Sequence, residues 1–126
     1  MSTTLLSGAG GALGAMARYV LSSLVTQVMG TQFPWGILFV NLAGCFAMGL
    51  VAGAGLQAIP LSDGMKAFLA TGILGGFTTF SAFSLDAVQL VERGQSMDAA
   101  VYVIASVAGS ITALIAGLAL VRAVAP

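Results

Sequence analysis

Asn41 is a polar residue in the middle of an apolar stretch, residues 35–56, and its side chain could do chemistry there. Its amide can donate two hydrogen bonds and accept two. An unsatisfied donor in hydrocarbon costs several kcal/mol, so Asn41 needs a partner. Two interpretations stay open: Asn41 bonds a neighbouring helix and holds a bundle together, or it donates to an anion along a polar pathway.

Residues 71–84 form a second group of residues whose types could bind an ion. Adjacent glycines at 75 and 76 are followed by Thr78, Thr79, Ser81 and Ser84. Paired glycines and hydroxyl residues are poor material for a continuous helix, so we expect a break in this segment. A break at membrane depth frees backbone carbonyl oxygens, which can coordinate a hard cation such as sodium. Two copies of the break meeting on a dimer axis could complete the coordination shell.

Two phenylalanines, Phe80 and Phe83, are spaced to share one face of the helix that resumes after the break. The positive edge of an aromatic ring can attract an anion without binding it as tightly as Lys or Arg would. Phenylalanines at this spacing are more often core packing. The nearby break and Asn41 are what favour a place in an anion pathway.

Tyr102, Ser106 and Ser110 recur every four residues and put hydroxyls along one face of the last apolar segment. Such hydroxyls can donate to an anion. A serine can equally bond its own helix backbone one turn earlier, and the pattern does not decide between the two.

Arg18 and Asp86 are charged residues that fall within the predicted spans, away from the first and last turns. Arg18 either anchors the structure or attracts anions to a vestibule. Asp86 cannot face lipid and would repel an anion. We therefore expect Asp86 to have a partner at the mouth of a pathway, although the sequence does not identify it.

The elements that position these residues must be membrane helices. Of 126 residues, 59% are apolar and 6% are charged, whereas soluble domains carry about 25% charged residues. No Asp, Glu, Lys, Arg or His occurs between Arg18 and Asp63. A membrane span takes about 20 residues. Hydropathy predicts an all-α fold with four spans, at residues 4–28, 35–56, 65–91 and 97–124.

Four spans fill the chain, so we expect a single transmembrane domain, residues 1–126, with no separate soluble domain. The first basic residue is Arg18, so the beginning reads as mature sequence rather than as a secretory signal. The single thiol, Cys45, lies among apolar residues and is predicted to be a small buried packing residue.

Small residues recur at four-residue spacing in each predicted span, which indicates helices packed closely through their backbones. The four Lys and Arg residues divide two against two between the predicted sides of the membrane, with Lys66 and Arg122 on one side and Arg18 and Arg93 on the other. Because orientation follows an excess of positive charge, this balance predicts dual topology and an antiparallel homodimer.

Three segments together are similar to a known family. Residues 10–19, GGALGAMARY, residues 35–44, WGILFVNLAG, and residues 72–84, GILGGFTTFSAFS, resemble the signatures of the Fluc (CrcB-type) fluoride channels. The likeness covers nearly the whole chain. An Asn-bearing span followed at this distance by Gly-Gly-x-Thr-Thr-Phe-Ser-x-Phe is a specific combination.

The resemblance implies a fluoride-specific channel in the prokaryotic plasma or inner membrane, giving passive efflux that reduces fluoride toxicity. It implies an antiparallel dual-topology homodimer with a structural sodium ion, not transported, at its centre. The residues that match the fluoride pathway are Asn41, Phe80, Phe83, Tyr102, Ser106, Ser110 and Arg18; those that match the sodium site, through backbone carbonyls, are Gly75 and Thr78.

Two positions depart from the family pattern. Ala82 stands where a hydroxyl residue is common between the phenylalanines, and Asp86 stands where a longer Glu is usual. These departures predict an altered outer polar part of the pathway, with the aromatic pair kept.

Other classes of protein fit less well. A small proton-coupled multidrug exporter needs a carboxylate in the first span, which is absent, and a scaffold would need no polar residues within the membrane. An enzyme is disfavoured because the chain has no His and no recognisable pair of carboxylates. No basic patch or P-loop indicates nucleic-acid or ATP binding.

Overall fold

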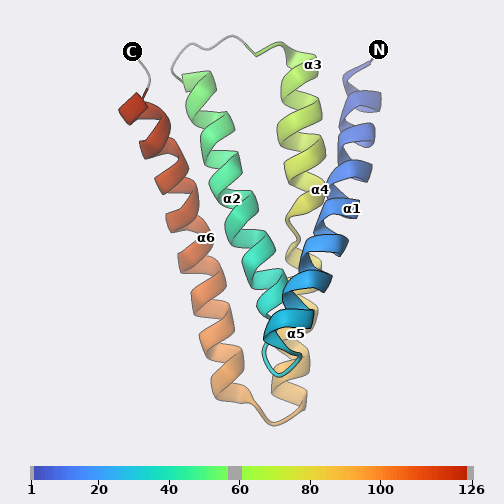
Figure 1. The fold of residues 1–126 in the computed structure, drawn as a ribbon, viewed down its shortest axis with the longest axis vertical. Helices are drawn as coiled ribbons and strands as arrows, with labels where there is room; N and C mark the ends of the chain where they lie inside the picture. The colour runs from blue at the N-terminus through green and yellow to red at the C-terminus, as the bar shows by residue number, and fades with distance from the viewer. Residues whose placement is uncertain (1, 57–60, 125–126) are drawn as a thin grey trace.

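The computed structural model describes residues 2–56 and 61–124, which form helices joined by short connections (Figure 1). Four long helical units lie side by side, and the third is composite. The elements in chain order are α1 (Thr3–Met29), α2 (Trp35–Leu56), then α3 (Asp63–Lys66), η1 (Ala67–Leu74), α4 (Gly75–Phe77) and α5 (Phe80–Glu92) making the third unit, and α6 (Ser96–Val124). The bounds predicted from hydropathy agree with these units to within two residues.

Three of these units are long and apolar enough to cross a membrane: Trp35–Ala54, Asp63–Glu92 and Ser96–Val124. The helix α1 is 27 residues long, which is sufficient length. Its Ser, Thr, Gly and Gln residues and Arg18 leave it less apolar than the others. The all-helical fold is therefore confirmed for the described residues, and three of the four predicted spans coincide with helices that are long and apolar enough to cross a membrane. The helix α1 packs against α2 and the third unit.

Close backbone contacts join the units in two pairs, as the small-residue spacing predicts. On α1, a Cβ at Gly10 or Gly14 would collide with backbone of the third unit, at Phe68 and Ile73 respectively. Between α2 and α6, Gly49 lies against the backbone of Leu114. In lipid, where helices gain no hydrophobic energy by meeting, such contacts supply the packing.

The third unit breaks at Thr78 and Thr79, where the backbone is extended (φ −81°, ψ 157° and φ −151°, ψ 125°). The predicted break is thus confirmed, but it falls after the paired glycines, which remain helical in α4. Gly76 serves packing instead, because a Cβ there would meet the backbone of Gly11. The turns before α4 are wound as a π-helix, η1, which the sequence did not reveal.

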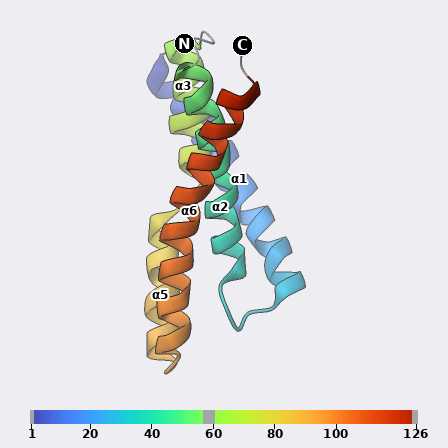
Figure 2. The same ribbon diagram turned by 90° about the vertical axis from the view of Figure 1, so that its left-hand side faces the viewer.

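The start of α1 and the end of α6 lie at the same end of the molecule (Figure 1). At the opposite end the molecule divides into two branches, with α1 and α2 in one and α5 and the first half of α6 in the other (Figure 2). The break in the third unit lies near the level where the branches separate.

Candidate functional site

A cavity of about 250 Å³ lies beside the helix break. Residues from α2, from the break itself, from α5 and from α6 form its wall. They are Asn41, Cys45, Thr78, Thr79, Phe80, Phe83, Ser106, Val107, Ser110 and Ile111. We call this space the break cavity. It brings together five of the seven residues predicted for an anion pathway, and the two that it lacks are Arg18 and Tyr102.

Asn41 holds the break in place. Its Nδ2 donates to the Thr79 carbonyl oxygen at 3.1 Å, and its Oδ1 accepts from the Thr79 amide at 2.8 Å. The interhelical role considered for Asn41 is therefore present in the structure. An amide nitrogen carries two hydrogens, so one donor of Asn41 remains for the cavity.

The break releases the two carbonyls that the family resemblance assigns to sodium. In a continuous helix the Thr79 amide would donate to the Gly75 carbonyl and the Ala82 amide to the Thr78 carbonyl. Here the Thr79 amide donates to Asn41 Oδ1, and the Ala82 amide donates to Thr79 Oγ1 at 3.1 Å. Side chains accept from both of these amides, so neither carbonyl oxygen receives the bond that a continuous helix would give it.

No group of three or more His, Cys, Asp or Glu side chains that could hold a metal occurs in residues 2–56 and 61–124. The carbonyl oxygens at the break are backbone oxygens. That is the donor set which a hard monovalent ion accepts.

Phe80 and Phe83 form an aromatic pair at the edge of the cavity, with ring centroids 5.4 Å apart and planes inclined at 48°. Their exposures differ sharply: Phe83 is 7% exposed and Phe80 is 76% exposed. Phe80 therefore presents most of its ring outside the single chain, where another surface can meet it.

Ser106 is 5% exposed, and its hydroxyl oxygen has no hydrogen-bond partner in the structure. This observation answers the question that the sequence left open for Ser106, since the hydroxyl does not bond its own helix. A buried hydroxyl without a partner costs free energy unless a ligand or water satisfies it. Ser106 is one of the residues that line the break cavity, and its hydroxyl is available to donate a hydrogen bond to a ligand or water.

Tyr102 provides the partner expected for Asp86. Its hydroxyl donates to Asp86 Oδ2 at 3.1 Å. The ring of Tyr102 is fully buried and packs on Phe83 at 5.2 Å between centroids and on Phe33 at 5.6 Å. Tyr102 does not line the break cavity, and its proton is directed to Asp86. The residues of the predicted hydroxyl stripe therefore have different surroundings. Ser106 and Ser110 line the break cavity, whereas Tyr102 does not.

A second polar cavity, of about 210 Å³, lies at the loop end of the bundle. The residues that line it come from α1, from the connection between α1 and α2, from the start of α2 and from the end of the third unit. They are Ser22, Thr26, Gly30, Thr31, Phe33, Pro34, Gly36, Ile37, Asp86, Gln89 and Arg93. Phe83 borders the break cavity and Phe33 borders this one, with Tyr102 in contact with both rings. Sequence reasoning missed this cavity, because its polar residues come from separate segments and form no motif.

Arg18 is not among the residues of either polar cavity. Its Nε is buried and has no hydrogen-bond partner in the part of the chain that the structure describes. The structure of the single chain does not bring Arg18 to the aromatic pair.

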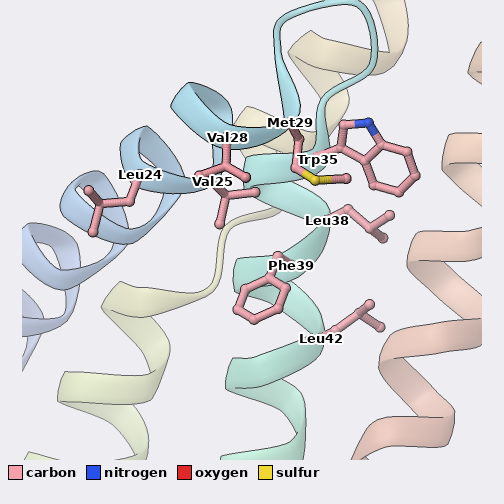
Figure 3. A pocket seen from close by; sticks show the side chains of 8 residues that line it. All are labelled: Leu24, Val25, Val28, Met29, Trp35, Leu38, Phe39 and Leu42. Atoms are coloured by element: carbon pink, nitrogen blue, oxygen red, sulfur yellow. The ribbon is translucent and has the colours of Figure 1, made fainter.

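An apolar groove of about 550 Å³ lies between the end of α1 and the first half of α2 (Figure 3). Its side chains are Leu24, Val25, Val28, Met29, Trp35, Leu38, Phe39 and Leu42. Apolar walls cannot replace the hydration of an ion, so this groove is not a candidate ion site.

A bundle of apolar helices, one of them broken beside a cavity that Asn, Thr and Ser side chains help to line, is an arrangement found in membrane proteins that handle ions. The chain belongs to the family described as CrcB-like protein, Camphor Resistance (CrcB), whose model matches residues 5–118. The membership predicted from the three segments is thereby confirmed.

Relatives of nearly equal length accompany the family match. "Fluoride-specific ion channel FluC" of Rhizobium meliloti (strain 1021) is 51% identical, with 98% of each chain covered. The protein of the same name from Chelativorans sp. (strain BNC1) is 52% identical over 91% of this chain and 92% of its own. That of Rhodospirillum centenum (strain ATCC 51521 / SW) is 49% identical, with 97% of each chain covered. These relatives are named as channels, so the prediction that the protein is not an enzyme is also confirmed.

Proposed function

We propose that this protein is a fluoride-specific ion channel that gives passive fluoride efflux and so reduces fluoride toxicity. The observation that carries the proposal is the break cavity, which Ser106, whose buried hydroxyl has no partner among the described residues, lines together with Asn41 and the Phe80–Phe83 pair. The names of the relatives support fluoride as the ion.

Fluoride suits this chemistry. It is small and strongly hydrated, so a pore must replace its water with close donors at several points. The cavity offers hydroxyls of Ser106 and Ser110, the remaining amide hydrogen of Asn41 and the ring edges of the phenylalanines. None of these groups carries a charge, which allows an anion to bind weakly and leave quickly.

The working unit in this proposal is an antiparallel homodimer. The high exposure of Phe80 supports the homodimer, because a single chain does not cover the Phe80 side of the pathway. The exposed position of Gly75 supports it too, since its released carbonyl needs further ligands from elsewhere. The balance of two positive residues against two supports opposite insertion of the two chains.

A structural sodium ion, held by the carbonyls of Gly75 and Thr78 from both chains, is part of the same proposal. The fit rests on the two carbonyls that lose their helical donors at the break. When bound, sodium would supply positive charge that draws the two breaks together. We place the channel in the prokaryotic plasma or inner membrane, with α1 as its fourth span.

The alternative of a proton-coupled exporter receives no support, because α1 carries no Asp or Glu. The decisive test is fluoride efflux from liposomes that contain only the purified protein, followed with a fluoride electrode beside a chloride control. We expect rapid fluoride release and chloride retention. Retention of fluoride by vesicles in which the protein is folded and inserted would overturn the proposal.

A further inference from the structure

Cys45 is the one thiol of the chain, and its residue type and apolar neighbours predicted only a packing role. In the structure it is partly exposed and lines the break cavity. It follows Asn41 by one helical turn on α2, so the two side chains share a face. The thiol therefore borders the same space as the donors described above.

The register between α2 and α6 explains this placement. Gly109 lies against the Leu42 side chain, and further along the pair Gly49 lies against the Leu114 backbone. The two helices run in the same direction (Figure 1), so Cys45 faces the part of α6 between these contacts. Ser110 is in that part and also lines the cavity.

An independent observation indicates that this space takes a ligand. Ser106 lines the cavity, and its buried hydroxyl has no hydrogen-bond partner among the described residues. In a closed apolar core, a buried hydroxyl would have a hydrogen-bond partner, or an apolar residue would take its place. Cys45 therefore borders a cavity with an unmet hydrogen-bonding need, rather than a sealed packing interface.

We propose that the Cys45 thiol is part of the wall of the ion pathway, and that it is the site at which a small thiol reagent closes the pathway. This inference rests on the proposed fluoride channel function. The cavity has a volume of about 250 Å³ and is already bordered by ten side chains. A methylthio group attached to Cys45 would occupy space that the ion and its donors need.

Methyl methanethiosulfonate, a small uncharged reagent, is the probe. The Cys45 thiolate attacks the divalent sulfur of the methylthio group, a disulfide bond forms, the bond from that sulfur to the sulfonyl sulfur breaks, and methanesulfinate leaves. The thiol proton goes to water. Intact mass then reports one methylthio group per chain, since the sequence has a single Cys.

The measurement is fluoride efflux from liposomes before labelling, after labelling and after reduction with dithiothreitol. We expect labelling to slow efflux about tenfold or more, because a pore of this size passes ions only through intact donor positions. Reduction should restore the original rate. In Cys45→Ser, the same treatment should leave that variant's own rate as it was before treatment.

A matched control moves the thiol to an exposed face of α6. Ile115 is 58% exposed, so Ile115→Cys in the Cys45→Ser background should label fully without slowing efflux. Equal inhibition in this control would overturn the inference, because the effect would then not depend on position 45.

Two further outcomes would also overturn it: complete labelling of Cys45 with an unchanged rate, or no labelling of the folded protein. If the unlabelled parent releases no fluoride, the proposed function fails and this inference fails with it. If the parent releases fluoride and labelling changes nothing, only the inference fails.

Discussion

Asn41 illustrates how much a single side chain does in this protein. Its side chain makes two hydrogen bonds to the Thr79 backbone, and one of them accepts from the amide that would bond the Gly75 carbonyl in a continuous helix. The same amide keeps one hydrogen for the break cavity. Structure and proposed function therefore depend on one residue, and changes at Asn41 should affect both.

Replacing Asn41 with Asp should cut fluoride efflux by about tenfold or more, since it removes the donor and adds a charge of the same sign as the ion. It also loses the bond to the Thr79 carbonyl, so the melting temperature in detergent should fall. Gln27→Glu makes the same chemical change at an exposed position of α1 and should conduct like the parent. Parental efflux through Asn41→Asp would remove Asn41 from the pathway.

Ser106→Ala separates a pathway role from a packing role. Its hydroxyl is buried without a partner, so its removal should leave the melting temperature unchanged or slightly higher. Efflux should nevertheless fall several-fold, because a donor is lost. Thr112→Ala, at an exposed position on the same helix, serves as the control. An unchanged efflux rate in Ser106→Ala would contradict the proposed role.

At the scale of the elements, the composite third unit meets its neighbours through two kinds of contact. Glycines on α1 let it approach η1 and α4 at backbone distance, whereas α5 meets α6 through the Tyr102–Asp86 hydrogen bond and aromatic packing. The first kind depends on the absence of side chains, and the second on particular side chains. Substitutions can test each kind separately.

Gly14→Ala should destabilise the protein by about 1–3 kcal/mol, because the added methyl would collide with the Ile73 carbonyl of η1. Gly11→Ala, three positions earlier on α1, introduces the same methyl where nothing lies within 4 Å. It should keep or raise the melting temperature. Thermal unfolding in detergent compares the two variants, and equal effects would show that the close approach of α1 does not matter to stability.

Tyr102→Phe keeps the ring contacts with Phe83 and Phe33 but removes the hydrogen bond to Asp86. We expect a loss of about 1–3 kcal/mol, because a partly buried carboxylate loses its partner. Adding Asp86→Asn should recover part of the loss. A double-mutant cycle on the free energy of unfolding measures the coupling between the two residues, and a coupling near zero would mean that the bond contributes nothing to the fold.

At the scale of the whole molecule, a single chain leaves parts of its site facing outward. Phe80 is mostly exposed, Gly75 is exposed, and Arg18 is not among the residues of either polar cavity. The start of α1 and the end of α6 share one end (Figure 1), so reversal in the membrane would move both together. An antiparallel partner would meet the exposed side of the break with the same residues in reverse order.

Orientation can be biased by charge to test this proposal. Thr31→Arg with Gln32→Arg adds two positive residues to the connection between α1 and α2 and should hold that connection in the cytoplasm. Cells that express this variant alone should lose fluoride resistance. A second variant, Thr3→Arg with Thr4→Arg, should insert the opposite way, and co-expression of the two should restore resistance. Full resistance with either variant alone, at a single orientation shown by reporter fusions, would rule out the antiparallel dimer.

By itself, the sequence determined that the chain folds in a lipid bilayer, where its helices begin and end, and which segment contains the site. Composition requires a bilayer, and hydropathy places the ends of the helices to within two residues because both are local properties of the chain. The paired glycines and hydroxyls predicted a break in the third unit, and the resemblance to the channel family predicted that Asn41 lies near Phe80 and Phe83, which directly follow that break.

Only the tertiary structure decided which partners these residues meet. Asn41 bonds Thr79, Tyr102 turns to Asp86 and away from the serine stripe, and Cys45 borders the cavity. These outcomes depend on how each helix is rotated and at what level it meets its neighbour. Rotation and level are set by glycine contacts between distant segments, such as Gly49 on Leu114, and a pattern within one segment carries no information about them.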